Sequence, residues 1–278
     1  MAYSKNNALV VRSDQEPPRA PALGAASRDA LPAVSPDGAR LVFSPAKGGG
    51  NVLVSLDGAG APRRFGEAHK QTERKMFSPD GMMLAWRADN TIWVLDLRDP
   101  QAKPRTLLRN LAPGGELQGF TADSQAVVVR NDDTVSWIGL DGKTRRSLKD
   151  TSFNDEAFSS EDRCIPSPVD ANVLVISLAT RGTAAYHQWA NDVSGALFLV
   201  DLASGTNYRL TPIRLAAGQP AWSPDGKRLY FSALPDAPPN GPHHLYRMNA
   251  DGTGLTDLGP GFAPSVGTRP ETKSARPE

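Results

Sequence analysis

Histidine and cysteine side chains, which most often bind metal ions or act as nucleophiles, are scarce in this sequence. The histidines are His69, His187, His243 and His244. Because adjacent side chains point to opposite sides of a strand, His243 and His244 could share a metal ion only from a loop. The single cysteine, Cys164, allows no disulfide within the chain and is predicted to be a small core residue. We expect no cofactor and no metal site.

Four aspartates could be taken for catalytic acids, but they share one position of a recurring tetrapeptide. They are Asp37, Asp80, Asp123 and Asp225. A pair of catalytic carboxylates needs two unlike environments, whereas a repeat places each carboxylate in a similar one. We therefore predict a structural role in turns. The sequence also contains no Gly-x-Ser-x-Gly nucleophile motif and no glycine-rich phosphate loop, which favours a protein that is not an enzyme and has no catalytic residue.

The tetrapeptide Ser-Pro-Asp-Gly marks an internal repeat. It occurs at 35–38, 78–81 and 223–226, with a degenerate Thr-Ala-Asp-Ser copy at 121–124. The copies at 35, 78 and 121 are spaced 43 residues apart, and a further unit starts at Ser167. Proline presets φ, aspartate can accept hydrogen bonds from backbone N–H groups two residues on, and glycine adopts the left-handed conformation that closes a hairpin. The predicted structural turn residues are Asp37, Gly38, Asp80, Gly81, Asp123, Asp225 and Gly226.

An apolar pair follows every copy of the motif at the same distance. Residues six and eight positions after the first motif residue are apolar, allowing one inserted residue in the fourth unit. This period of two is typical of a strand with one buried face. The pairs are Leu41 and Phe43, Leu84 and Trp86, Val127 and Val129, Leu174 and Ile176, and Leu229 and Phe231. A third and a short fourth strand are predicted to follow, and four strands in about 43 residues match one blade of a β-propeller.

The predicted fold class is therefore all-β, a β-propeller of four-stranded blades. We expect six blades, the last one closed by strands from both termini, which would remove exposed sheet edges. The chain is predicted to form a single domain over residues 1–267. Its repeats cover about 32–73, 74–116, 117–162, 163–218 and 219–258, the composite blade takes 8–31 and 259–267, and 268–278 form a disordered tail.

Two segments carry a family resemblance. Trp222–Phe231 and Leu245–Thr253 are similar to the repeat consensus of the TolB-type, WD-repeat-like β-propellers. TolB is a partner-binding component of a bacterial envelope complex in the periplasm, and it carries an α/β domain before its propeller that this sequence does not contain. The resemblance implies a non-catalytic scaffold for protein interaction. Similar repeats also occur in propellers that gate prolyl-oligopeptidase-like hydrolases and in oligogalacturonate lyases, so a ligand-binding, lyase or hydrolase use of the central channel is the alternative.

Three insertions interrupt the repeat between the second and third strands of a blade. They span Ser44–Gly50, Ala179–Ser194 and Ala233–His244. This connection leaves every blade on the rim opposite the Ser-Pro-Asp-Gly hairpins, so the insertions should share one face, which is predicted to bind. The middle loop carries aromatic and polar side chains typical of interfaces, although a loop that covers its own blade is the other interpretation. The candidate binding residues are Tyr186, His187, Gln188, Trp189, Asn191, Asp192, His243 and His244.

Charge and apolar patterning narrow the class of partner. The 31 basic and 30 acidic residues are scattered along the chain with a net charge of +1, which argues against nucleic acid or an anionic membrane as the main partner. No apolar run approaches the roughly 18 residues of a membrane span, and Ala8–Val11 is too short for a signal peptide. We expect a soluble monomer that binds another protein, cytoplasmic as the sequence stands. A third interpretation is a truncated propeller of a larger exported protein, which would be periplasmic.

Overall fold

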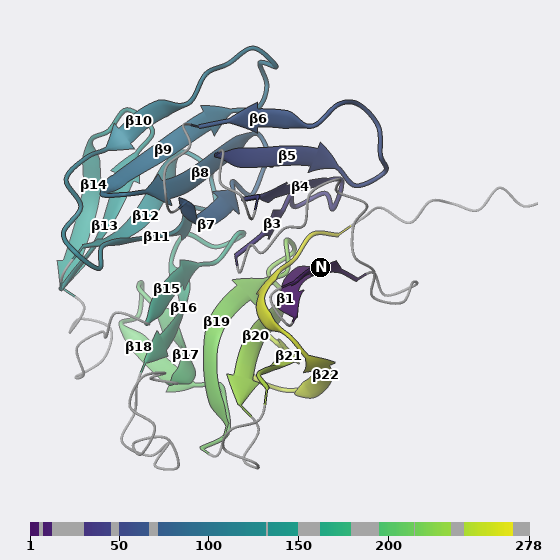
Figure 1. Ribbon diagram of the computed structural model, residues 1–278. Helices are drawn as coiled ribbons and strands as arrows, with labels where there is room; N and C mark the ends of the chain where they lie inside the picture. The colour runs from purple at the N-terminus through teal and green to yellow at the C-terminus, as the bar shows by residue number, and fades with distance from the viewer. Residues whose placement is uncertain are drawn as a thin grey trace, which may run out of the picture.

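The computed structural model describes residues 1–5, 8–12, 31–45, 50–66, 72–131, 133–149, 162–178, 195–213, 215–234 and 242–268. These residues form six antiparallel sheets. The sheets stand as blades around a common centre, as Figure 1 shows, and this arrangement is a six-bladed β-propeller. The predicted fold class and number of blades are confirmed. Within the described ranges the chain forms no helix that could cross a membrane.

Five blades contain four strands each, taken in chain order, with the first strand of each nearest the centre in Figure 1. The first and second blades are β3 (Ala33–Val34), β4 (Arg40–Phe43), β5 (Asn51–Ser55) and β6 (Arg63–Phe65), then β7 (Thr72–Phe77), β8 (Met83–Ala88), β9 (Thr91–Asp96) and β10 (Arg105–Leu108). The third and fourth are β11 (Glu116–Phe120), β12 (Ala126–Asn131), β13 (Thr134–Gly139) and β14 (Thr144–Lys149), then β15 (Arg163–Pro166), β16 (Val173–Leu178), β17 (Ala196–Asp201) and β18 (Thr206–Arg209). The fifth is β19 (Ala216–Trp222), β20 (Arg228–Leu234), β21 (His244–Asn249) and β22 (Thr256–Pro260).

The sixth blade joins both ends of the chain. Its described strands are β23 (Phe262–Ser265), β1 (Ala2–Lys5) and β2 (Ala8–Val11), paired in the order β23, β1, β2. The sequence-based boundary at residue 8 missed β1, whose Ala-Tyr-Ser-Lys has too few apolar residues to be recognised as a strand. Thr268, the first residue of the predicted tail, lies within the described residues, and its N donates to Pro36 O at 2.8 Å.

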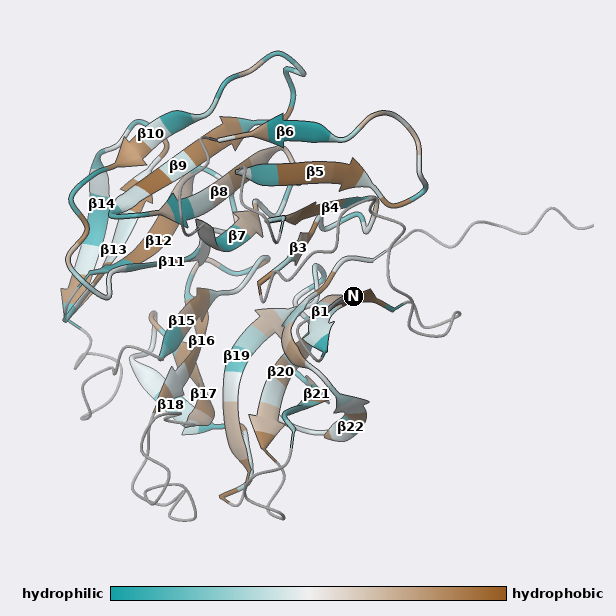
Figure 2. Cartoon of the chain, in the orientation of Figure 1, coloured by the Kyte–Doolittle hydropathy of each residue, from teal (hydrophilic) through white to brown (hydrophobic). Residues whose placement is uncertain are grey.

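Apolar side chains of the second and third strands fill the space between neighbouring blades. In Figure 2 the hydrophobic colour is concentrated on inner and middle strands such as β5 and β9, and the outer β6 and β14 carry polar colour. Every residue of the predicted apolar pairs is buried, so this prediction is confirmed. One cluster joins Leu197 of the fourth blade to Phe231 and Tyr246 of the fifth. Packing between blades therefore determines where the inner strands stand around the channel.

Each Ser-Pro-Asp-Gly motif forms the hairpin between the first and second strands of its blade. In the first blade Gly38 has φ of 68°, and Gly38 N donates to Ser35 O at 2.8 Å. Asp37 Oδ1 accepts a hydrogen bond from Ala39 N at 3.0 Å and another from the Ser35 hydroxyl. In the third blade Ser124 takes the glycine position with φ of 60°, which serine tolerates less well than glycine.

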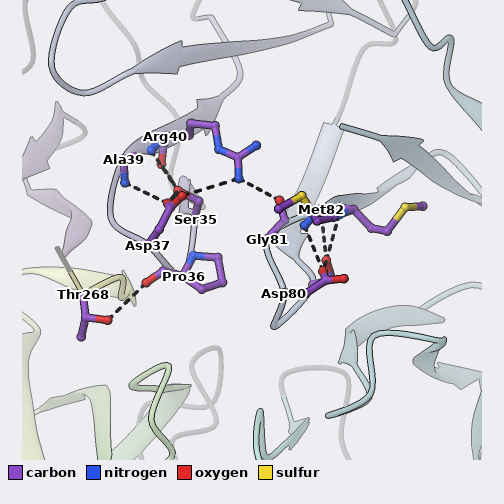
Figure 3. A network of polar contacts seen from close by, with 11 residues as sticks. Ser35, Pro36, Asp37, Ala39, Arg40, Asp80, Gly81, Met82 and Thr268 are labelled. Carbon is purple, nitrogen blue, oxygen red and sulfur yellow. Dashed lines mark hydrogen bonds and ion pairs between the residues drawn. The ribbon is translucent and has the colours of Figure 1, made fainter. Parts of the chain in front are cut away.

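Hydrogen bonds link these hairpins from blade to blade. Arg40 Nη2 of the first hairpin donates to Gly81 O of the second at 2.8 Å, as Figure 3 shows. Asp80 N then donates to Ser124 Oγ of the third at 3.2 Å. Thr268, which follows the closing strand, returns to Pro36 of the first hairpin (Figure 3). The hairpins of the first three blades and the closing segment are thereby joined in a row.

Candidate functional site

The predicted loop-face residues are only partly described. Those of the middle loop, Tyr186, His187, Gln188, Trp189, Asn191 and Asp192, lie outside the described residues. His244 Nδ1 lies 2.8 Å from Asp257 Oδ2, whereas the His243 ring packs edge-on against Phe262 with 5.1 Å between centroids. The two rings therefore have separate partners. The described ranges contain no group of three or more histidine, cysteine or acidic side chains that could hold a metal ion.

Cys164 lies in β15 and is fully buried. Burial raises the pKa of the Cys164 thiol to about 12, against a smaller opposite effect of Arg130. The thiol is therefore protonated at neutral pH, whereas a nucleophilic cysteine needs a lowered pKa. Cys164 is part of the core, as expected from the sequence.

A cavity of about 150 Å³, which we call the mouth, opens between the hairpins. Two repeat positions recur in its wall: the residue before each motif and the proline inside it. Lining residues of these kinds include the aromatic Phe77, Phe120 and Trp222 and the prolines Pro36, Pro79 and Pro224. The motif that closes each hairpin thus also builds an apolar rim around the channel.

A second cavity of about 280 Å³, which we call the chamber, adjoins the mouth because Arg74 lines both. Most of the residues that line the chamber are charged, whereas most of those that line the mouth are apolar. Its lining residues are Leu31, Arg74, Arg87, Glu116, Leu117 and Arg163. Three guanidinium groups therefore share this wall with one carboxylate.

Most of the residues that line the chamber occupy one position of the repeat. It lies four residues before the first residue of each motif, and in the five complete blades it holds Leu31, Arg74, Leu117, Arg163 and Gln219. The apolar periodicity of the repeat does not single out these residues, because several of them are polar. Comparing this position across the repeat would have revealed two arginines and a glutamine among leucines.

Gln219 and Arg74 meet across the channel although they are 145 residues apart, with Arg74 Nη2 donating to Gln219 Oε1. Gln219 has φ of 52° and lies where β19 changes its register against β20, between Gly218 and Ala221. Such a bulge redirects a side chain that a regular strand would have pointed elsewhere. Arg74 lies in a similar irregularity of β7, between Thr72 and Lys75.

Arg163 and Glu116 form an ion pair inside the channel. Arg163 Nη1 lies 2.9 Å from Glu116 Oε2 and also donates to Asp162 O at 3.0 Å. Both side chains are largely buried, with exposed fractions of 7% and 20%. An ion pair at this depth is screened by water much less than a surface pair.

Arg74 is a cation of the channel whose Nε atom is buried and whose pKa departs from its ordinary value. The pKa of Arg74 is lowered to about 9, mainly by burial and then by the positive charge of Arg163, against the opposite effect of Glu116. Burial also lowers the pKa of Arg130, which lies near the same groups. Arg74 is still protonated at neutral pH, so the chamber presents a poorly hydrated positive charge.

The fold defines the chain as a β-propeller with a central channel, and the comparisons with known proteins agree with that class. No protein-family model and no curated protein sequence matches this chain. Solved structures do: a protein assigned as TolB from Agrobacterium tumefaciens is 17% identical with a TM-score of 0.64, covering 93% of this chain and 91% of that one. TolB from Acinetobacter baumannii is 20% identical with a TM-score of 0.68, covering 95% of this chain and 65% of that one.

Propellers of other activities have the same fold. A puromycin hydrolase mutant is 14% identical with a TM-score of 0.51, and the match covers 91% of this chain but 42% of the hydrolase. Identities this low establish the fold alone. The chain is thus a TolB-like propeller in structure, and its function has to be argued from its own channel.

Proposed function

We propose that the chain is a non-catalytic, monomeric binding module that takes a short apolar segment of a partner protein into the mouth of its channel. The observation that carries this proposal is the apolar rim of prolines and aromatic rings. The mouth, at about 150 Å³, is close in size to apolar cavities that bind a benzene-sized molecule. It therefore suits one or two apolar side chains of a segment better than a broad folded surface.

The chemistry of the described residues supports a role without catalysis. Cys164 has a pKa of about 12, and the motif aspartates are engaged in their own hairpins. The fold shared with TolB supports partner binding by analogy. The loop face with Tyr186 and Trp189 is a second candidate surface for the same partner.

Affinity capture with variants tests this proposal. Pro79→Arg places a long charged side chain at the rim, and the third blade, which has Ala122 at this position, indicates that the hairpin does not require proline. The matched control is Val169→Arg, because Val169 is 59% exposed, belongs to another hairpin and does not line the mouth. We expect a partner that the wild type and the control retain and the Pro79 variant loses. Retention by all three forms would overturn the mouth as the binding site.

The loop face is tested in the same experiment. A chain lacking residues 184–192 that loses the partner, while the Pro79 variant keeps it, would assign binding to the loops. If no form retained any partner above background, the protein-binding function itself would be rejected. The chamber, with its three guanidinium groups, favours a second function, which is binding of a small ligand in the channel.

A further inference from the structure

Arg74 holds a buried positive charge with an unusual partner. Its Nε atom is buried and has no hydrogen-bond partner among the described residues, and its one described acceptor is the neutral Gln219 Oε1. Buried charges in proteins are normally paired with an opposite charge, because an unpaired one is costly to desolvate. Glu116, the carboxylate that lines the chamber, forms its described ion pair with Arg163 instead. Arg74 therefore has N–H donors to spare, since a guanidinium carries five.

The backbone around Arg74 is arranged to hold it in place. Gln219 adopts φ of 52°, a conformation that costs a non-glycine residue energy, and it does so at a bulge that directs its side chain to Arg74. Strain of this kind persists where the surrounding structure requires it, and it is concentrated at ligand sites. The Arg74 guanidinium is thus positioned in advance, which lowers the entropic cost of binding to it.

Arg74 also stands at the boundary between two unlike cavities. On one side is the apolar mouth, and on the other is the chamber with its three guanidinium groups and one carboxylate. A ligand that satisfies both sides needs an anionic group joined to an apolar group. Guanidinium groups match the planar geometry of a carboxylate with two parallel hydrogen bonds. A phosphate dianion also fits this geometry but is more costly to dehydrate next to the apolar rim.

We propose that the chamber binds a carboxylate group through Arg74, with the apolar substituent of the ligand lying in the mouth. The carboxylate can belong to a free small acid or to the end of a partner's chain. The site goes beyond the proposed function, because it can be filled with no partner protein present. Its failure is therefore distinguishable from failure of partner capture.

Isothermal titration of the full chain with defined probes tests the site. The first probe is 3-phenylpropionate, compared with its uncharged amide and with inorganic phosphate. We expect the acid to bind at least 10-fold more tightly than either. Equal affinity of acid and amide would overturn the proposal, and so would tighter binding of inorganic phosphate than of the acid.

Two variants assign the binding to Arg74. Arg74→Met removes the charge and keeps the length of the side chain, and we expect at least a 10-fold rise in Kd. Gln219→Glu supplies Arg74 with a carboxylate of its own, so it should also weaken binding of the acid at least 10-fold while the chain keeps its folded circular dichroism spectrum. This second variant keeps the test decisive if the Arg74 variant fails to fold. The control is Arg98→Gln, at an exposed arginine that pairs with Asp96, and it should leave Kd unchanged. Unchanged affinity in a folded Gln219→Glu protein would overturn the role of Arg74.

The source of the carboxylate is distinguished with a peptide. The probe is acetyl-Ala-Ala-Ala-Ala-Phe with a free carboxyl end, compared with the same peptide as its amide. Tighter binding of the peptide acid than of 3-phenylpropionate would assign the site to the end of a partner's chain, and the reverse order would assign it to a small free acid. Either order supports a carboxylate site, whereas no measurable binding of either acid would reject it.

Discussion

The aspartate of the hairpin motif accepts two hydrogen bonds through one carboxylate oxygen. In the fifth blade Asp225 Oδ1 accepts a hydrogen bond from Ser223 Oγ at 2.6 Å and another from Lys227 N at 3.1 Å. The hydrogen bond from Ser223 is the main reason that the pKa of Asp225 is lowered. Asp123 shows the same pattern with Thr121. The carboxylate therefore stabilises a turn, and it carries no proton to donate at neutral pH.

Replacing this aspartate tests its structural role. Asp225→Ala removes an acceptor of two hydrogen bonds, and we expect the free energy of unfolding to fall by about 1 kcal/mol. Urea denaturation followed by circular dichroism measures the change. Asp225→Asn keeps an oxygen acceptor and should lose less stability. If the asparagine variant were as unstable as the alanine variant, the hydrogen-bond explanation would be wrong.

The lowered pKa values also predict how stability depends on pH. Asp123 and Asp225 have folded pKa values below the unfolded value of about 3.9, so their charged forms stabilise the fold above that pH. This contribution is lost as the pH falls through the folded pKa values. The wild type should therefore exceed the double variant Asp123→Asn, Asp225→Asn in Tm at neutral pH, and the difference should shrink below about pH 4. A difference that stayed constant down to pH 2.5 would contradict the prediction.

At the scale of the strand, a glycine fixes how the closing segment meets the first blade. A Cβ atom at Gly267 would lie 2.2 Å from Ser35 O and 2.8 Å from Gly38 Cα, both of them backbone atoms that cannot rotate away. Val34 N donates to Ser265 Oγ at 2.9 Å in the same contact. We call this contact, between residues 262–268 and the first blade, the seam. The close approach lets the C-terminal segment reach the first hairpin.

Substitution of this glycine should open the seam. We expect Gly267→Ala to destabilise the fold by about 1–3 kcal/mol, as overpacking usually does. The matched control is Gly218→Ala, where a Cβ atom would meet nothing within 4 Å. Neither glycine has the positive φ that would strain alanine by itself. Equal Tm values for the two variants in thermal denaturation would show that the seam is not tightly packed.

For the whole molecule, stability depends on closing the ring with both ends of the chain. Ala2 pairs with Ser265 and Ser4 with Phe262, so β23 gives β1 its place in the sixth blade. Without β23, β1 and β2 would form an isolated hairpin, which is marginally stable at best. The ring would also expose a free strand edge.

A shortened chain tests the closure. A protein that ends at Pro260 lacks β23, and we expect a clearly lower Tm, a broader unfolding transition and self-association in size-exclusion chromatography. The control ends at Thr268 and keeps every described contact of the seam, so its Tm should equal that of the full chain. Equal behaviour of the two shortened chains would mean that β23 is dispensable.

Charge also differs between the chain and the folded molecule. A net charge of +1 from 31 basic and 30 acidic residues describes the sum and not the distribution. Folding collects Arg74, Arg87 and Arg163 in one chamber. Nucleic acids and anionic membranes need an extended basic outer surface, which a balanced composition disfavours, whereas a single small anion needs only an enclosed group of cations.

The sequence alone determined the blades, because their signals are local. A hairpin needs proline, aspartate and glycine within four residues, and a half-buried strand needs an apolar residue at every second position. The repeat position four residues before each motif, which holds Arg74 and Gln219, was also visible in the sequence. Nothing in its neighbouring residues distinguished it from other polar positions. β1 was missed for a related reason, since its pairing with β23 joins residues from opposite ends of the chain.

The tertiary structure decided which side chains line the channel and which of them meet there. Arg74 and Gln219 lie 145 residues apart and come into contact only because six blades complete a circle. The mouth and the chamber likewise take their walls from several blades, so no single repeat contains either of them. Periodicity specifies each blade by itself, whereas the contents of the channel depend on packing between blades, which brings side chains together irrespective of their distance along the sequence.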